Sequence, residues 1–267
     1  MATSRSRYPL RNADPEEGAR LGTLQSLHDA STIRQFERLG VGPGWRCAEL
    51  GAGAGSVARW LADAVGDSGS VTAIDRDTTL LQELGTRPNV TVVEADLMTT
   101  ALGTSCFDLV HSRSVLMHLD DPDTVVQHVV PALAPGASVL FEEVDGEPAQ
   151  RAASGAELPA PFREVMVPLA AQWTWARTLA ARLVALGLTD VHDDVRDDLL
   201  VGGSPAAAFW RQTLTTIRPL VTDAARMESL GRSPVEDSSF DAMIELLGEP
   251  SFAVPFAARH RVSGRRP

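Results

Sequence analysis

The sequence contains no lysine, and only two cysteines and one tyrosine occur among its 267 residues. All 24 basic residues are arginine, which we attribute to the codon bias of a GC-rich genome and not to a mechanism. Cys47 and Cys106 lie in apolar runs without a CxxC pair or a Cys/His cluster, so neither a disulfide framework nor a structural zinc site is expected. There is no metal-ligating pattern elsewhere, and we expect no metal.

Long hydrophobic runs are also missing. No stretch of 18 apolar residues occurs, so we expect no transmembrane helix and no membrane partner. The first ten residues lack the apolar segment of a signal peptide, which favours a cytoplasmic protein.

Positive charge is scarce as well: 35 acidic residues oppose the 24 arginines and the net charge is −11. Such a field repels phosphate backbones, so we expect no nucleic-acid partner.

Short apolar runs alternate with helical patterns through the first half of the chain, which is typical of a parallel sheet covered by helices. We expect strands at 46–50, 71–74, 90–93, 107–111, 137–141, 191–201 and 252–262. We expect helices at 16–39, 57–65, 78–84, 122–133, 162–186, 205–230 and 236–247, with a loop over 146–160.

A glycine-rich segment follows the first predicted strand and opens a helix. Gly51, Gly53 and Gly55 alternate in it, and glycine lets a backbone adopt positive φ and approach a ligand closely. A dinucleotide loop needs glycines at positions one, three and six, but position six from Gly51 is Ser56. The carboxylate of Glu49 at the loop disfavours a pyrophosphate and favours a cationic sulfonium or amino group. The loop therefore predicts a nucleotide-like ligand with a positive charge.

The run from Glu49 to Gly55, Glu-Leu-Gly-Ala-Gly-Ala-Gly, resembles the first motif of class I S-adenosylmethionine (SAM)-dependent methyltransferases. The chain is most similar to the small-molecule type, which includes UbiE-like and natural-product enzymes. Four further motifs resemble that family in order, at residues 71–75, 94–97, 107–110 and 133–137, with Ala137 in place of the family's second glycine. The resemblance implies an α/β fold: a Rossmann-like sheet of seven strands with an antiparallel last strand, plus a helical cap.

The resemblance implies three regions. Residues 1–45 would form an N-terminal helical lid, 46–145 the SAM-binding α/β core, and 146–267 the rest of the sheet with a helical cap over the acceptor site. Tyr8 and His28 of the first region are candidates to close over the cofactor.

The resemblance also places cofactor contacts. Asp75, at the end of the second strand, would hold the ribose hydroxyls, and Asp96 the adenine amino group. Each carboxylate could instead only cap the turn that follows it. The residues expected to bind the cofactor are Glu49, Gly51, Ala52, Gly53, Gly55, Asp75, Arg76, Asp96, Leu97, His111 and Arg113.

Three residues are candidates for catalysis. His118 follows the fourth strand, and in similar enzymes this segment faces the acceptor, so His118 could remove a hydroxyl proton. Glu142 and Glu143 end the fifth strand, and alternation directs one of them toward the pocket. A packing role for His118, a capping or solvated role for the two acids and a structural ion pair for Arg113 remain open alternatives.

The predicted reaction is methyl transfer from SAM to a small organic acceptor, most simply O-methylation of a bacterial secondary metabolite. The signatures of nucleobase methylation, N/D-P-P-Y/F and a Pro-Cys nucleophile, are absent, as is a recognisable Asp/Asp/Asn magnesium set. Two alternatives remain: a SAM-binding protein of this fold with cyclase or structural function, and an NAD(P)-dependent oxidoreductase. The sequence is compatible with a homodimer.

Overall fold

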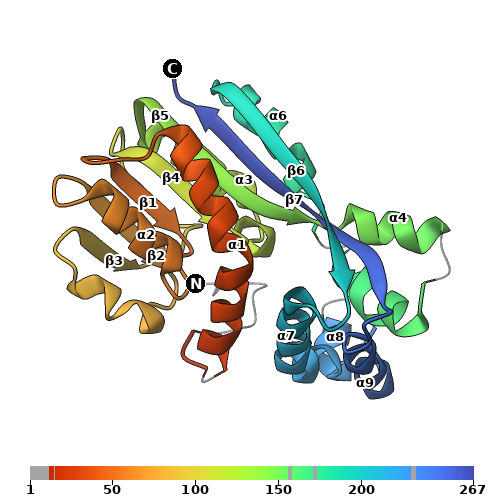
Figure 1. Ribbon diagram of the computed structural model, residues 1–267. Coiled ribbons are helices and arrows are strands. Elements are labelled where there is room, and N and C mark those ends of the chain that lie inside the picture. The colour runs from red at the N-terminus through yellow and green to blue at the C-terminus, as the bar shows by residue number, and fades with distance from the viewer. Residues whose placement is uncertain (1–11, 15, 156–157, 171–172, 230–232) are drawn as a thin grey trace. The chain divides into compact units, whose positions relative to one another are not determined.

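The computed structural model describes residues 12–14, 16–155, 158–170, 173–229 and 233–267, and strands alternate with helices through its first half (Figure 1). The strands are β1 (Arg46–Leu50), β2 (Ser70–Asp75), β3 (Val90–Glu94), β4 (Phe107–Arg113), β5 (Leu133–Asp145), β6 (Thr189–Val201) and β7 (Ala253–Arg265). The helices are α1 (Glu17–Leu39), α2 (Ser56–Val65), α3 (Pro122–Ala132), α4 (Glu147–Gly155), α5 (Val167–Ala170), α6 (Leu179–Ala185), α7 (Pro205–Val221), α8 (Ala224–Ser229) and α9 (Asp237–Leu246).

The seven strands form one sheet in the order β3-β2-β1-β4-β5-β7-β6. β1 pairs in parallel with β2 and β4, β2 with β3, and β4 with β5. At the start of β5, the Gly136 N–H donates to the Arg266 carbonyl and the Arg266 N–H donates to the Ala137 carbonyl, so β7 runs antiparallel to β5. The predicted α/β sheet with an antiparallel last strand is confirmed. The strand order reverses between β1 and β4, and ligands bind at the carboxyl ends of strands at such a point.

The chain divides into two compact units. The first consists of Met1–Glu143, Arg177–Asp194 and His260–Pro267, and the second of Val144–Ala176 and Val195–Arg259. The lid and cap roles of the three predicted regions remain predictions.

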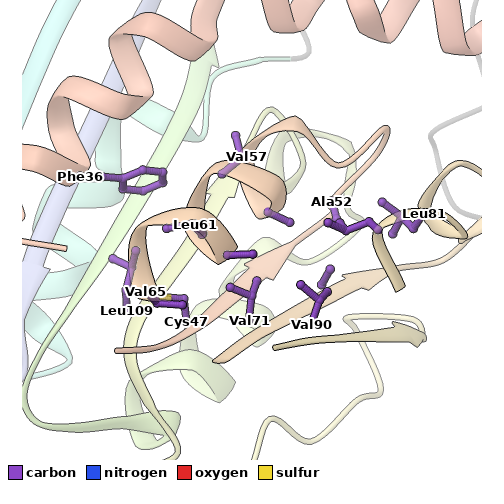
Figure 2. Packing of buried hydrophobic residues seen from close by; sticks show 14 of the residues in the cluster. Phe36, Cys47, Ala52, Val57, Leu61, Val65, Val71, Leu81, Val90 and Leu109 are labelled. Atoms are coloured by element: carbon purple, nitrogen blue, oxygen red, sulfur yellow. The ribbon is translucent and has the colours of Figure 1, made fainter. Parts of the chain in front are cut away.

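The core of the first unit lies between α2 and the central strands (Figure 2). Val57, Leu61 and Val65 follow the helical period of α2 and are buried against the sheet. The Phe36 ring of α1 stacks on Trp60 of α2, with ring centroids 5.4 Å apart. This packing holds the middle of α2 against α1.

Aromatic residues form the core of the second unit. The ring centroids of Trp173 and Trp210 lie 5.6 Å apart, and the Phe256 ring packs edge-on against Trp210 at 4.9 Å. Trp173 is 8% exposed. The cluster therefore supplies apolar packing for this unit.

Two local predictions were wrong because side chains and backbone compete with helix formation. At 78–84 the structure has short 3-10 turns at Thr79–Leu81 and Leu84–Thr86. Asp77 Oδ1 accepts hydrogen bonds from the Thr79 N–H and hydroxyl at 3.1 and 2.6 Å, which favours a turn over a helix. The single helix predicted at 162–186 is instead a π-helical turn at Phe162–Met166, then α5, a 3-10 turn and α6. Pro168 in α5 cannot donate to the Glu164 carbonyl, so a regular helix cannot continue there.

The loop predicted at 146–160 was also wrong, because α4 occupies Glu147–Gly155. Asp145 Oδ1 accepts a hydrogen bond from the Glu147 N–H at 2.9 Å and so caps the start of this helix. The helix predicted at 205–230 is divided into α7 and α8. Asp223 accepts the Arg226 N–H at 3.1 Å and begins the second of them.

Candidate functional site

The loop between β1 and α2 depends on its three glycines. Gly51, Gly53 and Gly55 have φ values of 70°, 55° and 78°, in the left-handed region that other residues rarely adopt. A Cβ on Gly51 would collide with the side chain of Val115, whereas among the described residues a Cβ on Gly53 would meet only Leu21, at 3.6 Å. Space beside Gly53 is therefore left open by the protein.

The start of α2 can bind an anion. Its N-cap is Gly55, which has no side chain, and within the part of the chain that the structure describes no side chain hydrogen-bonds to the first N–H groups of this helix. Uncapped N–H groups together with the helix dipole stabilise a carboxylate or phosphate. The loop thus offers an anion-binding helix end within a few residues of the carboxylate of Glu49.

Asp75, the last residue of β2, is tied to the glycine loop. Its Oδ2 accepts a hydrogen bond from the Gly53 N–H at 2.8 Å, and Oδ1 accepts one from the Asp77 N–H at 3.0 Å. Burial raises the pKa of Asp75, and these backbone N–H groups oppose the rise. The Asn12 amide nitrogen donates to the Asp77 carbonyl at 2.6 Å and lies 3.5 Å from Asp75 Oδ1. The chain before α1 therefore crosses the end of β2, next to the exposed Arg76.

Asp96 lies in the turn after β3. Its Oδ1 accepts the Met98 N–H at 2.9 Å, so the turn-capping alternative is present in the structure. Among the described residues, Oδ2 of Asp96 has no hydrogen-bond partner, and it can accept a further donor. The neighbouring Leu97 side chain is buried.

Glu49, His111 and Glu142 form a buried polar chain across β1, β4 and β5. His111 Nδ1 lies 2.6 Å from Glu49 Oε2, and His111 Nε2 lies 3.3 Å from Glu142 Oε2. His111 and Glu142 are both 0% exposed. Burial disfavours the charged ring, but the charge of Glu49 and hydrogen bonds to both acids outweigh it and raise the pKa of His111 to about 9.

The two carboxylates at the ends of this polar chain, Glu49 and Glu142, differ in the direction of their pKa shifts. Burial opposes ionisation of Glu142, yet hydrogen bonds and charge from His111, with a hydrogen bond from Thr32, lower its pKa to about 2. Arg261 Nε also donates to Glu142 Oε1 at 3.0 Å. Burial raises the pKa of Glu49, and the adjacent His111 opposes that rise. The chain therefore holds an imidazolium between two acids.

Arg113 connects β4 to α1. Its Nη1 donates to the Thr32 hydroxyl at 2.9 Å and its Nη2 to Asp29 Oδ1 at 2.7 Å. Asp29 also accepts the hydroxyl of Ser56, the first residue of α2, at 3.1 Å. The structural ion pair that the sequence left open for Arg113 is present, and it links α1 to the end of the glycine loop.

Glu143 faces the opposite way from Glu142 and holds the turn after β4. Its carboxylate accepts the N–H groups of Val115, Leu116 and Met117 at 3.1, 3.0 and 3.2 Å. The same turn ends at His118. Glu143 therefore fixes the backbone that presents His118.

His118 is half-buried at the end of this turn. Burial, and then the positive charge of Arg20 in α1, lower the pKa of His118 to about 4. Arg20 is itself paired with Glu17. Near neutral pH the imidazole is therefore uncharged, which is the form that accepts a proton.

Sequence reasoning missed Asn12, Asp29, Thr32 and Arg261. A signal was available for Thr32, since a polar residue four positions before Phe36 lies on the buried face of α1. Arg261 lies on the last strand, and only the tertiary fold brings it to Glu142. Tyr8 lies outside the described residues.

Within the described ranges, no group of three or more His, Cys, Asp or Glu side chains has the geometry to hold a metal ion. None of the helices in the described part of the chain is long and apolar enough to cross a bilayer.

Part of the chain is similar to known proteins. Residues 48–141 match a family model described as a methyltransferase domain. The chain is 28% identical over 134 residues to methyltransferase str2 of Strobilurus tenacellus, covering 50% of this chain and 48% of that protein. It is 26% identical over 115 residues to the ubiquinone/menaquinone biosynthesis C-methyltransferase UbiE of Shewanella sediminis (strain HAW-EB3), covering 40% and 46%. The chain spans about half the length of the curated relatives it matches.

Solved structures share the fold. The [4+2]-cyclase SpnF aligns with a TM-score of 0.55 and 18% identity, over 90% of this chain and 80% of that chain. At this identity the likeness concerns the fold alone. The order of the sequence motifs, the strand order and the match over residues 48–141 agree in their likeness to class I SAM-dependent methyltransferases of the small-molecule type.

Proposed function

We propose that this protein binds SAM and transfers its methyl group to a small organic acceptor. The observation that carries the proposal is the loop from Gly51 to Gly55, with three left-handed glycines and an uncapped helix start, tied to Asp75 at the switch point of the sheet. The residues fit the cofactor. The helix start suits the carboxylate of its amino-acid part, Glu49 suits the amino group, and Asp75 suits a vicinal diol.

The remaining cofactor contacts follow from position. Asp96 Oδ2 is available for the adenine amino group, and the Leu97 backbone lies beside it. Gly51, Ala52, Gly53 and Gly55 form the floor under the amino-acid part, with Arg76 at the rim beyond Asp75. The contacts of His111 and Arg113 support an indirect role, in which they fix Glu49 and the start of α2.

When bound, SAM supplies an electrophilic methyl group on a sulfonium. The protein's part is to place the acceptor in line, exclude water and receive a proton. We propose His118 as the proton acceptor, because it is neutral near pH 7 and Glu143 fixes its turn. Glu142 is hydrogen-bonded to His111, Thr32 and Arg261, which favours an anchoring role over proton transfer.

A base at this position favours a hydroxyl as the acceptor, so we propose O-methylation, with a bacterial secondary metabolite as the substrate. The acidic net charge of −11 supports a small-molecule substrate over a nucleic acid. We propose a cytoplasmic enzyme, and sedimentation would tell whether it is a monomer or the homodimer.

The test combines binding and turnover. Thermal shift with SAM, S-adenosylhomocysteine, NAD and NADP should show stabilisation by the first two alone. Incubation with SAM and candidate phenols or alcohols should release S-adenosylhomocysteine together with a product heavier by one methyl group. Stabilisation by NAD or NADP instead would establish the oxidoreductase alternative.

The likeness to SpnF supports a second candidate function, that of a SAM-binding protein whose chemistry is not methyl transfer. Binding of SAM without formation of S-adenosylhomocysteine, while the acceptor is converted to an isomer of equal mass, would favour it. Formation of S-adenosylhomocysteine and the methylated acceptor in equal amounts would exclude this second candidate.

A further inference from the structure

We infer that His111 is a positioning residue that aims the Glu49 carboxylate at the amino group of the bound cofactor. The inference rests on the proposed function and assigns a task to the buried chain that links β1, β4 and β5.

Contacts on both sides immobilise the His111 ring. Its two nitrogens contact Glu49 at 2.6 Å and Glu142 at 3.3 Å, and Phe36 packs edge-on against the ring, with centroids 4.9 Å apart. Because both nitrogens have an acceptor, the ring cannot turn without breaking a buried hydrogen bond.

Glu142 anchors the His111 ring, because its own carboxylate is held in place by further hydrogen bonds. Its Oε1 accepts Arg261 Nε at 3.0 Å, and its Oε2 accepts the Thr32 hydroxyl as well as contacting His111. The two acids, the imidazolium and the guanidinium sum to zero charge, so the chain can be buried without an unpaired ion.

Glu49 has one oxygen left. Its Oε2 is held by His111, whereas Oε1 has no hydrogen-bond partner among the residues that the structure describes. Glu49 is the penultimate residue of β1, immediately before the glycine loop, and is 3% exposed. An oriented acceptor oxygen with so little access to water suits an ammonium group delivered by a ligand.

A purely structural role makes a different prediction. If the chain only docks α1 on the sheet, loss of His111 should weaken every ligand of the site alike. If His111 orients Glu49, the loss should appear only for ligands that carry the amino group. S-adenosylhomocysteine carries it, and 5′-methylthioadenosine retains the adenine, ribose and sulfur without the amino-acid part.

The experiment measures the dissociation constants of both ligands by calorimetry for the full chain and for His111→Gln. We expect the dissociation constant of S-adenosylhomocysteine to rise by about tenfold or more in the variant, which is the scale of a hydrogen bond to a charged group. Methylthioadenosine should change by less than about twofold on the same scale. His260→Gln is the matched control. It removes another buried histidine, paired with Asp193 at 2.8 Å, and should leave both constants unchanged.

Equal weakening of both ligands, or no weakening of either, would overturn the inference. If His111→Gln does not fold, Glu142→Gln takes its place. It removes the anchor of the ring without touching Glu49 and should show the same ligand selectivity in smaller measure; equal weakening of both ligands would overturn the inference there too. Failure of the unaltered protein to bind S-adenosylhomocysteine would instead overturn the proposed function, and the inference with it.

Discussion

The backbone N–H of Gly53 donates a hydrogen bond to Oδ2 of Asp75 across 2.8 Å. This bond joins the loop after β1 to the end of β2, so the position of the proposed ribose acceptor and the shape of the glycine loop depend on each other. A second bond, from the Asp77 N–H to Oδ1, fixes the orientation of the carboxylate.

Replacing Asp75 should therefore weaken the binding of the cofactor without unfolding the protein. For Asp75→Ala we expect SAM affinity to fall by about 1.5–3 kcal/mol, because the diol loses a charged acceptor. Calorimetry measures the affinity and circular dichroism the fold. Asp77→Asn is the matched control, since the Asp77 carboxylate is already bonded to Thr79 and Ala13. Unchanged affinity in folded Asp75→Ala would refute the ribose assignment.

Gly53→Val should abolish SAM binding for two reasons. A β-branched residue at φ 55° is strained, and its methyl groups would enter space that the protein leaves open beside the loop. The control is Gly22→Ala in the second turn of α1, where a Cβ meets no described atom within 4 Å. That change should leave binding intact and stabilise α1 by up to about 1 kcal/mol. Native affinity in Gly53→Val would mean that the loop is only a turn.

The buried chain around His111 predicts a pH dependence of the free energy of unfolding. The groups facing the ring are Glu49 from β1 and Glu142 from β5, with Arg261 from β7 and Arg113 from β4 nearby. The pKa of His111 is raised from 6.5 to about 9, so its contribution is complete below pH 6.5 and is lost as pH rises through about 9. The pKa of Glu142 is lowered from 4.5 to about 2, so its contribution is complete above pH 4.5 and is lost as pH falls through about 2.

Urea unfolding at pH steps from 5 to 10 checks the alkaline side. The free energy of unfolding should decline between pH 6.5 and 9 in the unaltered protein, and His111→Gln should remove most of that decline. A decline of the same size in the variant would assign it to other groups.

His118→Ala should lower turnover by at least about tenfold while SAM affinity stays nearly unchanged, since a general base contributes about 10²–10⁴ in rate. The pKa of about 4 places the loss of rate in the unaltered enzyme on the acid side, where the ring becomes protonated. Steady-state rates on the identified acceptor from pH 4 to 9 give the loss of turnover in the variant and the pH dependence of the rate in the unaltered enzyme. Full turnover of the variant across that range would remove His118 from the mechanism and leave positioning as the source of rate.

Local sequence patterns were sufficient for the cofactor side of the fold. The β1-loop-α2 unit was predictable because glycine spacing and apolar periodicity act over a few residues, and both survive in the structure. The prediction for α3 held for the same reason, with Asp121 as its N-cap and Pro122 at its first position.

Contacts between distant residues were not predictable in this way. The hydrogen bonds from Thr32 and Arg261 to Glu142 span 110 and 119 positions, and nothing within a short window predicts them. These contacts change the interpretation of Glu142, which the sequence presents only as an acid at the end of a strand. Similarly, the alternation of β5 allowed either acid to face the pocket, and only the fold shows that Glu143 holds the turn before His118.

The glycine loop and Asp75 together are the core of the proposed SAM site. Isothermal calorimetry of S-adenosylhomocysteine with the full chain tests it most directly, run in parallel with folded Gly53→Val and with NAD as the competing ligand. We expect one S-adenosylhomocysteine bound per chain, no binding to the variant and no heat with NAD. Saturable binding of NAD with none of S-adenosylhomocysteine, or equal binding of S-adenosylhomocysteine to Gly53→Val, would contradict it.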